Sequence, residues 1–377
     1  ACIVAGERCL RLGAYVDANR LGGSGLQHVE RLRPEAALPL RLELLAVQVH
    51  SNQWLMRAQE LESELSRVAD VARQRGLPAE AARAYYLMSF VHNERGDFPK
   101  ARAMTLEAAQ ASRTADVDTL QRQLANTGRC LALIERDIAR ADEFLHEAEA
   151  LGQKRAGRTA LEMTWGRGLV HAFDGLDEAA VPLLERAAAL AELESDHWAT
   201  TQALTRVARL ALERRRPGEA IERCRALEPV LAKLAAGSEA PFIRALAGLS
   251  RLGLGDPGAF ADVERALREL RLVDSKAHVA YVLNALAEHH ANSGRIDEAR
   301  RRAEEALVAA EAVGHRSEAA VARSRLALST LDREAALALI RACGPDWAKL
   351  WVLSARARAT VAAATERFGI ERPDAES

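Results

Sequence analysis

Aromatic side chains are scarce in this chain: phenylalanine, tryptophan and tyrosine make up only 4% of its 377 residues, although 49% are hydrophobic. We therefore expect a core built from alanine and leucine rather than from aromatic rings. Runs of valine, isoleucine and threonine, which favour strands, are also missing. The abundant residues are alanine, leucine, glutamate and arginine, all of them good helix formers. The composition predicts an all-α protein.

The chain also lacks paired cysteines and an excess of either charge. Its 52 basic and 53 acidic side chains give a formal charge of −1, so nothing in the overall charge favours binding to nucleic acid or to an anionic membrane. Its five cysteines are widely spaced and contain no Cys-x-x-Cys pair, which gives no support for a zinc ribbon or a redox motif. Scattered reduced thiols are typical of a cytoplasmic protein.

Long uncharged apolar runs are absent, so the sequence predicts no transmembrane helix. The first residues, Ala1 to Arg8, have no basic region ahead of an apolar stretch, and we therefore predict no signal peptide. The sequence starts without a methionine and part-way through the repeat described next. From this we expect it to be a fragment of a larger protein.

A repeat of about 40 residues runs through the chain. Its clearest copy is Gly294 to Ala306, in which alanines follow the glycine after five and twelve residues. The glycine suits a turn between two helices, and the alanines lie near one face of the second helix. Predicted turns at this spacing lie near residues 13, 53, 96, 136, 175, 215, 255, 294 and 331. All of these turns except the one near residue 255 have an alanine five residues later, which predicts stacked helical hairpins.

A second set of small residues lies seven positions before the turns. Glycine, alanine or serine occupies this position in every copy except the fourth, which has Arg129. Small residues allow the two helices of a hairpin to approach closely where they cross. We expect Gly128 to take this role in place of Arg129.

The small residue before the turn, the turn glycine and the two alanines after it resemble the tetratricopeptide repeat. The resemblance covers about residues 1–343 and is best at Gly96–Ala101, Gly175–Ala180 and Gly294–Ala299. The period near 40, rather than about 34, is similar to that of the sensor regions of bacterial maltose-activator-type regulators and related signalling (STAND) ATPases. The resemblance implies a right-handed α-solenoid of about nine hairpins.

The repeat pattern ends at Cys343. Gly344 and Pro345 break the preceding helix, and residues 347–368 are predicted to form one further helix that covers the last hydrophobic face of the solenoid. We therefore divide the chain into a solenoid at 1–343, a capping segment at 344–368 and a disordered tail at 369–377.

No set of residues in the sequence predicts catalysis. The glycine-rich stretches lack the lysine of a phosphate-binding loop. His289 and His290 are adjacent on a predicted helix, so they point about 100 degrees apart and cannot share a metal as residues four apart do. We predict neither an enzyme nor a cofactor.

Stacked hairpins create a concave surface lined by the first helix of each hairpin. The family resemblance implies that residues about 13, 10, 6 and 3 positions before each turn face inward. The candidates for binding are Arg83, Tyr86, Asn93, Gln123, Asn126, Trp165, Gln202, Arg209, Tyr281, Asn284, Glu288 and Arg325. This mixture of aromatic, amide and arginine side chains is typical of recognition surfaces. For the aromatic residues, packing between adjacent repeats is the alternative.

These observations favour a non-catalytic sensor domain of a cytoplasmic bacterial signalling or transcription-regulating ATPase, with a protein or peptide as its partner. A ligand that spans several repeats would change the curvature of the solenoid and expose a neighbouring module. Two alternatives remain open: a constitutive protein-interaction scaffold, and a domain that binds a small-molecule inducer in its concave groove. We expect no direct contact with nucleic acid and none with membrane.

Overall fold

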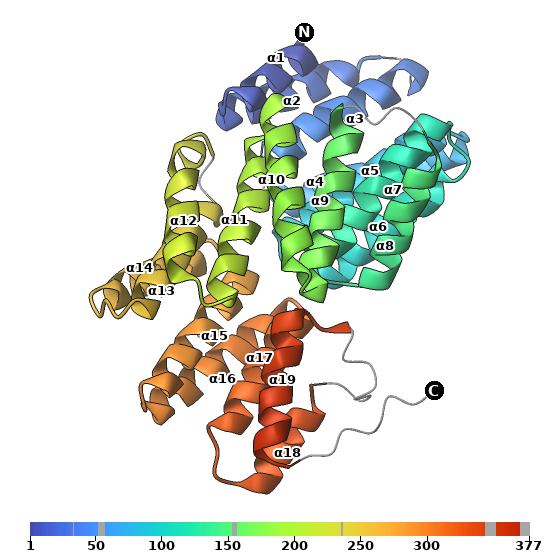
Figure 1. The fold of residues 1–377 in the computed structure, drawn as a ribbon. Helices are drawn as coiled ribbons and strands as arrows, with labels where there is room; N and C mark the ends of the chain where they lie inside the picture. Colours follow the sequence, from blue (N-terminus) through green and yellow to red (C-terminus); the bar gives the residue numbers. More distant parts are fainter. Residues whose placement is uncertain (33, 52–56, 153–156, 235–236, 344–351, 370–377) are drawn as a thin grey trace, which may run out of the picture.

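The computed structural model describes the chain except for residues 33, 52–56, 153–156, 235–236, 344–351 and 370–377, and except for the side chains of residues 34–36 (Figure 1). Within the described ranges the chain forms nineteen α-helices and no strand. No helix among the described residues is long and apolar enough to cross a membrane.

Eighteen helices form nine consecutive hairpins, which confirms the predicted α-solenoid. The hairpins are α1 (Cys2–Arg11) with α2 (Tyr15–Val29), α3 (Pro34–His50) with α4 (Ala58–Gln74), α5 (Pro78–Glu94) with α6 (Phe98–Ser112), α7 (Val117–Leu133) with α8 (Ile138–Ala150), α9 (Gly157–Asp174) with α10 (Asp177–Leu193), α11 (His197–Glu213) with α12 (Pro217–Leu231), α13 (Glu239–Gly253) with α14 (Ala259–Leu272), α15 (Lys276–Asn292) with α16 (Ile296–Ala312), and α17 (Arg316–Leu328) with α18 (Arg333–Arg341).

The last helix, α19 (Ala355–Arg367), packs against α17 and also touches α9. It begins later than the sequence predicted, because Val352 to Ser354 are not α-helical and Ser354 has an extended backbone. The predicted start of this helix at Trp347 and most of the predicted tail lie outside the described residues.

Most hairpin turns use a glycine in the left-handed backbone conformation that glycine adopts without steric cost. Gly96, Gly175 and Gly294 have φ angles of 70, 83 and 74°. The turn of the fourth hairpin differs, because the left-handed residues are Glu135 and Asp137, with φ angles of 51 and 49°, on either side of the predicted Arg136. The predicted turn near residue 53 falls outside the described residues.

Gly128 takes the helix-crossing role expected of it. A Cβ atom at this position would lie 2.6 Å from Cγ of Leu145 and 2.8 Å from the carbonyl oxygen of Ala141, both on the partner helix α8. Close approach at Gly128 leaves the next residue, Arg129, turned into the interior of the solenoid, where it is almost fully buried. The exception in the repeat pattern therefore brings a charged side chain into the core.

Replacing Gly128 with alanine should destabilise the protein by about 1–3 kcal/mol, because the added methyl group overlaps α8. Gly218→Ala is the matched control, since a Cβ atom there meets nothing within 4 Å and Gly218 also lies in a helix. Urea unfolding of the two variants measures the difference. Equal stabilities would contradict the proposed close crossing.

The solenoid winds tightly enough for hairpins five positions apart to touch. In the first and sixth hairpins, Nε2 of His197 lies 3.2 Å from the carbonyl oxygen of Arg11. In the fourth hairpin, Arg136 donates a hydrogen bond to the carbonyl oxygen of Gly314, at the start of the ninth. These contacts close the inner surface of the solenoid on itself.

A contact with the same spacing of five positions is present at the C-terminal end, where α19 follows the ninth hairpin and takes the place of a tenth. Arg358 of α19 donates a hydrogen bond of 3.0 Å to the carbonyl oxygen of Asp174 in the fifth hairpin. Further along the seam, Phe98 and Val313 share a small hydrophobic cluster. We call this set of contacts between hairpin n and position n + 5 the closing seam. These contacts narrow the inner surface, which is hollowed into a partly open cavity.

Candidate ligand-binding cavity

A cavity of about 710 Å³ lies inside the N-terminal two thirds of the solenoid. The first helices of the first seven hairpins, α1 to α13 in odd numbers, all contribute to its wall. Its volume lies in the range of small-ligand sites, about 300–1,000 Å³. The lining mixes aromatic and polar side chains, chiefly Tyr86, Phe90, Trp198, Arg83, Gln123 and Asn126.

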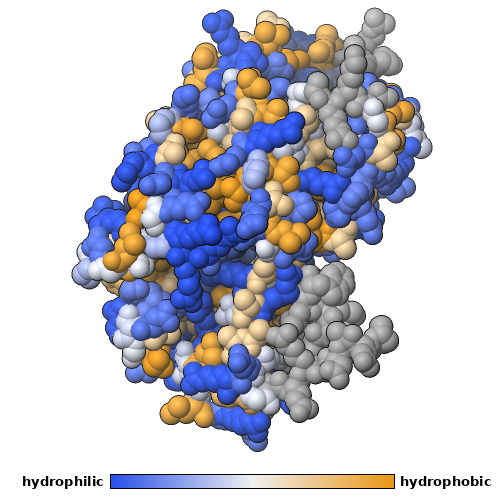
Figure 2. All heavy atoms as spheres, viewed as in Figure 1, coloured by the Kyte–Doolittle hydropathy of each residue, from blue (hydrophilic) through white to orange (hydrophobic). Residues whose placement is uncertain are grey.

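The outer surface carries no comparable feature on the face shown in Figure 2. Hydrophobic and hydrophilic residues are interspersed there over most elements. Singly exposed apolar side chains such as Leu193, Leu272 and Leu331 are ordinary on protein surfaces. The cavity is therefore the candidate binding site.

Asn126 is the most informative residue of the cavity wall. Its side chain is only 7% exposed, and its Oδ1 atom has no hydrogen-bond partner among the described residues. A buried carbonyl oxygen without a partner costs about 1–3 kcal/mol. Because Asn126 lines the cavity, a bound molecule with an N–H or O–H group is in a position to supply the missing donor.

Two ion pairs fix the helices around the cavity. Arg83 of α5 donates to Glu43 of α3, with one N–O distance of 2.6 Å. Arg158 of α9 pairs with Asp196, whose carboxylate also caps α11 by accepting from the amide of Ala199. The pairs connect neighbouring hairpins, so the cavity wall is held by charge as well as by packing.

A charged pair lies buried beneath the cavity wall. Nε of Arg129 is 2.6 Å from Oε2 of Glu162, and the two side chains are 2% and 0% exposed. Arg129 also donates to the hydroxyl of Tyr86 over 3.0 Å, and burial raises the pKa of Tyr86 to about 12. Burial alone would raise the pKa of Glu162, but Arg129 and Arg158 outweigh it and lower this pKa.

Trp165 does not lie on the open concave surface where the sequence analysis placed it. Its side chain has no exposed area and belongs to the main hydrophobic core. The ring of Trp198 packs edge-on against it at a centroid distance of 5.6 Å, and the guanidinium of Arg129 lies 5.0 Å from its centroid. Trp165 therefore packs between repeats, which is the alternative that the sequence analysis gives for the aromatic residues.

Trp198 is an aromatic residue of the cavity wall that the sequence analysis missed. It contacts Phe90 at a ring-centroid distance of 5.1 Å and lines the cavity from α11. A signal existed, because Trp198 lies four residues before the candidate Gln202 and so occupies the same helix face one turn earlier. The inward-facing positions were taken from shorter repeats and reach no more than about 13 residues before the turn. Trp198 lies about one helical turn beyond that limit, because the helices of this chain are longer.

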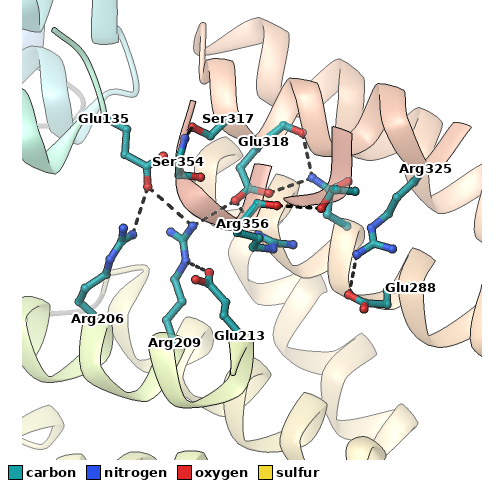
Figure 3. A network of polar contacts seen from close by, with 12 residues as sticks. Glu135, Arg206, Arg209, Glu213, Glu288, Ser317, Glu318, Arg325, Ser354 and Arg356 are labelled. Carbon is teal, nitrogen blue, oxygen red and sulfur yellow. Dashed lines mark hydrogen bonds and ion pairs between the residues drawn. The ribbon is translucent and has the colours of Figure 1, made fainter. Parts of the chain in front are cut away.

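Arg209 lies further along the inner surface, in a network of polar contacts (Figure 3), and Tyr281 packs against it. The guanidinium groups of Arg209 and Arg356 both contact the ring of Tyr281, at 4.3 and 4.4 Å from its centroid. Arg209 and Arg356 both pair with the buried carboxylate of Glu318, over 3.2 and 2.8 Å. Glu318 thus connects the sixth and ninth hairpins to α19.

Asn284 and Glu288 complete this network. Asn284 is fully buried and donates to Oε2 and to the carbonyl oxygen of Glu318, over 2.8 and 3.0 Å. Glu288 pairs with Arg325 over 2.5 Å and with Arg215 over 3.2 Å. The predicted site residues therefore differ in accessibility: the side chain of Glu288 is 36% exposed, Arg209 and Tyr281 line a smaller cavity, and Asn284 is covered. Asn284 in particular is a core residue.

A smaller cavity of about 150 Å³ lies between the large cavity and this network. Trp198 and Glu239 line both cavities. The predicted residues Asn93 and Gln202 lie in the wall of the smaller one, where each donates a hydrogen bond to a carboxylate, Asn93 to Glu94 over 3.3 Å and Gln202 to Glu239 over 3.4 Å. In the described part of the chain, no group of three or more metal-ligating side chains is arranged to hold a metal.

No protein-family model and no curated protein sequence matches this chain. Solved structures match it. The crystal structure of a Rap protein complexed with competence and sporulation factor has a TM-score of 0.57 and 12% identity, over 90% of this chain and 98% of that one. This likeness confirms the tetratricopeptide-like solenoid fold.

Two further structures match with lower scores. A STAND protein with a tetratricopeptide repeat sensor, from Pyrococcus horikoshii, has a TM-score of 0.44 and 14% identity, over 92% of this chain and 58% of that one. Aspartyl phosphate phosphatase F from Bacillus subtilis has a TM-score of 0.39 and 12% identity, over 98% of this chain and 90% of that one.

Proposed function

We propose that this chain is a non-catalytic sensor domain that binds a short peptide in its central cavity. The observation that carries the proposal is Asn126, a nearly buried residue of the cavity wall whose side-chain carbonyl oxygen has no hydrogen-bond partner among the described residues. Gln123, one turn earlier on the same helix, lines the same wall. Two neighbouring amide side chains offer the donors and acceptors that an extended peptide backbone requires.

The remaining lining supports a peptide as the ligand. Phe90, Tyr86 and Trp198 offer apolar and aromatic contacts for side chains, whereas Arg83 and Arg122 place cationic groups at the wall. The Rap protein with a similar fold was crystallised with competence and sporulation factor, so a solenoid of this type is able to hold a bound effector. A small-molecule inducer is the second candidate, favoured by the volume of the cavity, which is typical of small-ligand sites.

The closing seam supplies a means of response. A ligand that contacts α3, α5, α7 and α11 together favours one curvature of the solenoid and shifts the population toward it. Hairpins across the seam then separate or tighten, and a neighbouring module reads the change. As in the sequence analysis, we propose that this module is a bacterial signalling or transcription-regulating ATPase of the cytoplasm.

Asn126→Ala tests the cavity directly. We expect the affinity for peptides that the wild-type chain selects from a pentapeptide pool to fall about tenfold, since one hydrogen bond to a buried acceptor is worth about 1–3 kcal/mol. Thermal stability should stay the same or rise, because the variant removes an unpaired buried oxygen. Asn292→Ala, at an exposed residue at the end of α15, is the control.

Affinity selection with mass spectrometry, followed by calorimetry on the selected peptides, measures the effect. Selected peptides that bind Asn126→Ala as tightly as the wild type would rule out this cavity as the binding site. If peptides are not retained while a small organic metabolite is, with the same dependence on Asn126, the inducer alternative replaces the peptide.

A further inference from the structure

Two carboxyl groups from distant parts of the chain meet where the two cavities join. Glu94 is the last residue of α5, and Glu239 is the first residue of α13. Both line the smaller cavity, and Glu239 lines the larger one as well. The winding of the solenoid is what brings the third and seventh hairpins together at this point.

Neither carboxyl group has a cationic partner among the described residues. Their hydrogen bonds come from neutral donors: the amide of Asn93 for Glu94, and for Glu239 the amide of Gln202, the indole of Trp198 and backbone N–H groups. Elsewhere in this interior the acidic side chains are paired with arginine, as Glu162 is with Arg129 and Glu318 with Arg356. Burial, together with the charge of Glu239, raises the pKa of Glu94 to about 8. Burial also raises the pKa of Glu239.

A second, independent feature of this cavity also lacks a partner. The hydroxyl of Thr205 has no hydrogen-bond partner among the described residues, its residue is only 8% exposed, and it lines the same cavity as the two carboxyl groups. Trp198 adds an aromatic ring that borders both cavities. Carboxylates, a free hydroxyl oxygen and an indole ring are the groups that bind organic cations.

We propose that the junction of the two cavities binds an ammonium or guanidinium group, with Glu94 and Glu239 as its counterions and Trp198 as its aromatic wall. The inference rests on the proposed function, because the cationic group belongs to the ligand of the central cavity. It is the basic side chain or amino terminus of a peptide, or a free polyamine. The bound cation supplies the positive charge that arginine supplies to the other buried carboxylates, and it donates hydrogen bonds to Glu94 and Glu239.

The test is calorimetry of the full chain at pH 8 with matched probes. Pentapeptide pools that contain arginine at one position are compared with pools that contain neutral citrulline there, and agmatine and spermidine represent free amines. We expect the arginine pools or the amines to bind. Glu94→Gln and Glu239→Gln should each weaken this binding by about tenfold or more, as expected when one charged hydrogen-bond partner is removed.

Glu304→Gln, an identical change at an exposed residue of α16, is the control and should have no effect. Both cavity variants should fold, because an amide resembles a protonated carboxyl group and ends the repulsion within the pair. Circular dichroism checks this, and either variant alone suffices for the test. If neither variant folds, Trp198→Leu replaces them in the binding test, and we expect it to lose the same amount of affinity for the arginine pools or amines.

Four results would overturn the inference. The first is that no arginine pool or amine binds, and the second is that citrulline pools bind as tightly as arginine pools. The third is that Mg²⁺ or Ca²⁺ binds alone and loses its affinity in Glu94→Gln, which would indicate a metal site. Peptide binding that depends on Asn126 but not on Glu94 or Glu239 would overturn this inference and leave the proposed function standing.

Discussion

Replacing Glu162 with alanine is expected to lower the free energy of unfolding by about 3–5 kcal/mol, the typical cost of breaking a buried ion pair. The reason is that Arg129 stays buried after its carboxylate partner is removed. Arg129 is 1% exposed, and among the described residues its guanidinium would keep only the hydroxyl of Tyr86 and the ring of Trp165 without Glu162. Arg158, the second partner of Glu162, retains Asp196 and therefore suffers less.

Chemical denaturation followed by circular dichroism measures this loss. The double variant Arg129→Met with Glu162→Leu should recover most of the stability, because a buried pair replaced by apolar side chains of similar size is often tolerated. Glu60→Ala is the surface control: Glu60 also pairs with an arginine, Arg57, but both side chains are more than half exposed. A loss at Glu162 no larger than that at Glu60 would contradict the description of a buried, coupled pair.

Glu318→Ala should have the second large effect, about 3 kcal/mol or more, together with a change of shape. Glu318 holds Arg209 of the sixth hairpin, Asn284 of the eighth and Arg356 of α19. Arg209 keeps Glu213 as a partner, but Arg356 has no other acidic partner in the described part of the chain. We expect the C-terminal hairpins to separate from the rest along the closing seam.

Small-angle scattering checks the change of shape as an increase in the radius of gyration, and denaturation checks the loss of stability. Glu311→Ala is a suitable control, since Glu311 pairs with Arg323 but is half exposed and lies away from the network. If Glu318→Ala is destabilised but keeps the dimensions of the wild type, then Glu318 supports only local packing and does not hold the seam.

The repeat was predictable from the sequence because its signals are local. A turn glycine, an alanine five residues later and a small residue seven before all act within one hairpin. Even the exception at Arg129 pointed correctly to Gly128. By contrast, the closing seam depends on small rotations between successive hairpins that add up over five hairpins. A local sequence pattern does not predict this total rotation.

The candidate binding residues fall into two groups, cavity-lining and buried, because local sequence patterns do not predict how distant hairpins pack. Arg83, Tyr86, Gln123 and Asn126 line the large cavity, whereas Asn284 and Trp165 are fully buried. Helix periodicity predicts which residues face inward, but it does not predict whether the inner space is empty or filled. Trp198 was missed because its position falls one turn outside the range taken from shorter repeats.

The closing seam also has a consequence for how this protein folds. An open solenoid has contacts only between neighbouring repeats, so its hairpins are able to form and melt one after another, as in a one-dimensional chain. Here residues almost 190 positions apart along the sequence are in contact, such as His197 with Arg11. Contacts of such long range slow folding and couple distant segments. We therefore expect the closing seam to make the hairpins unfold together, as one cooperative unit.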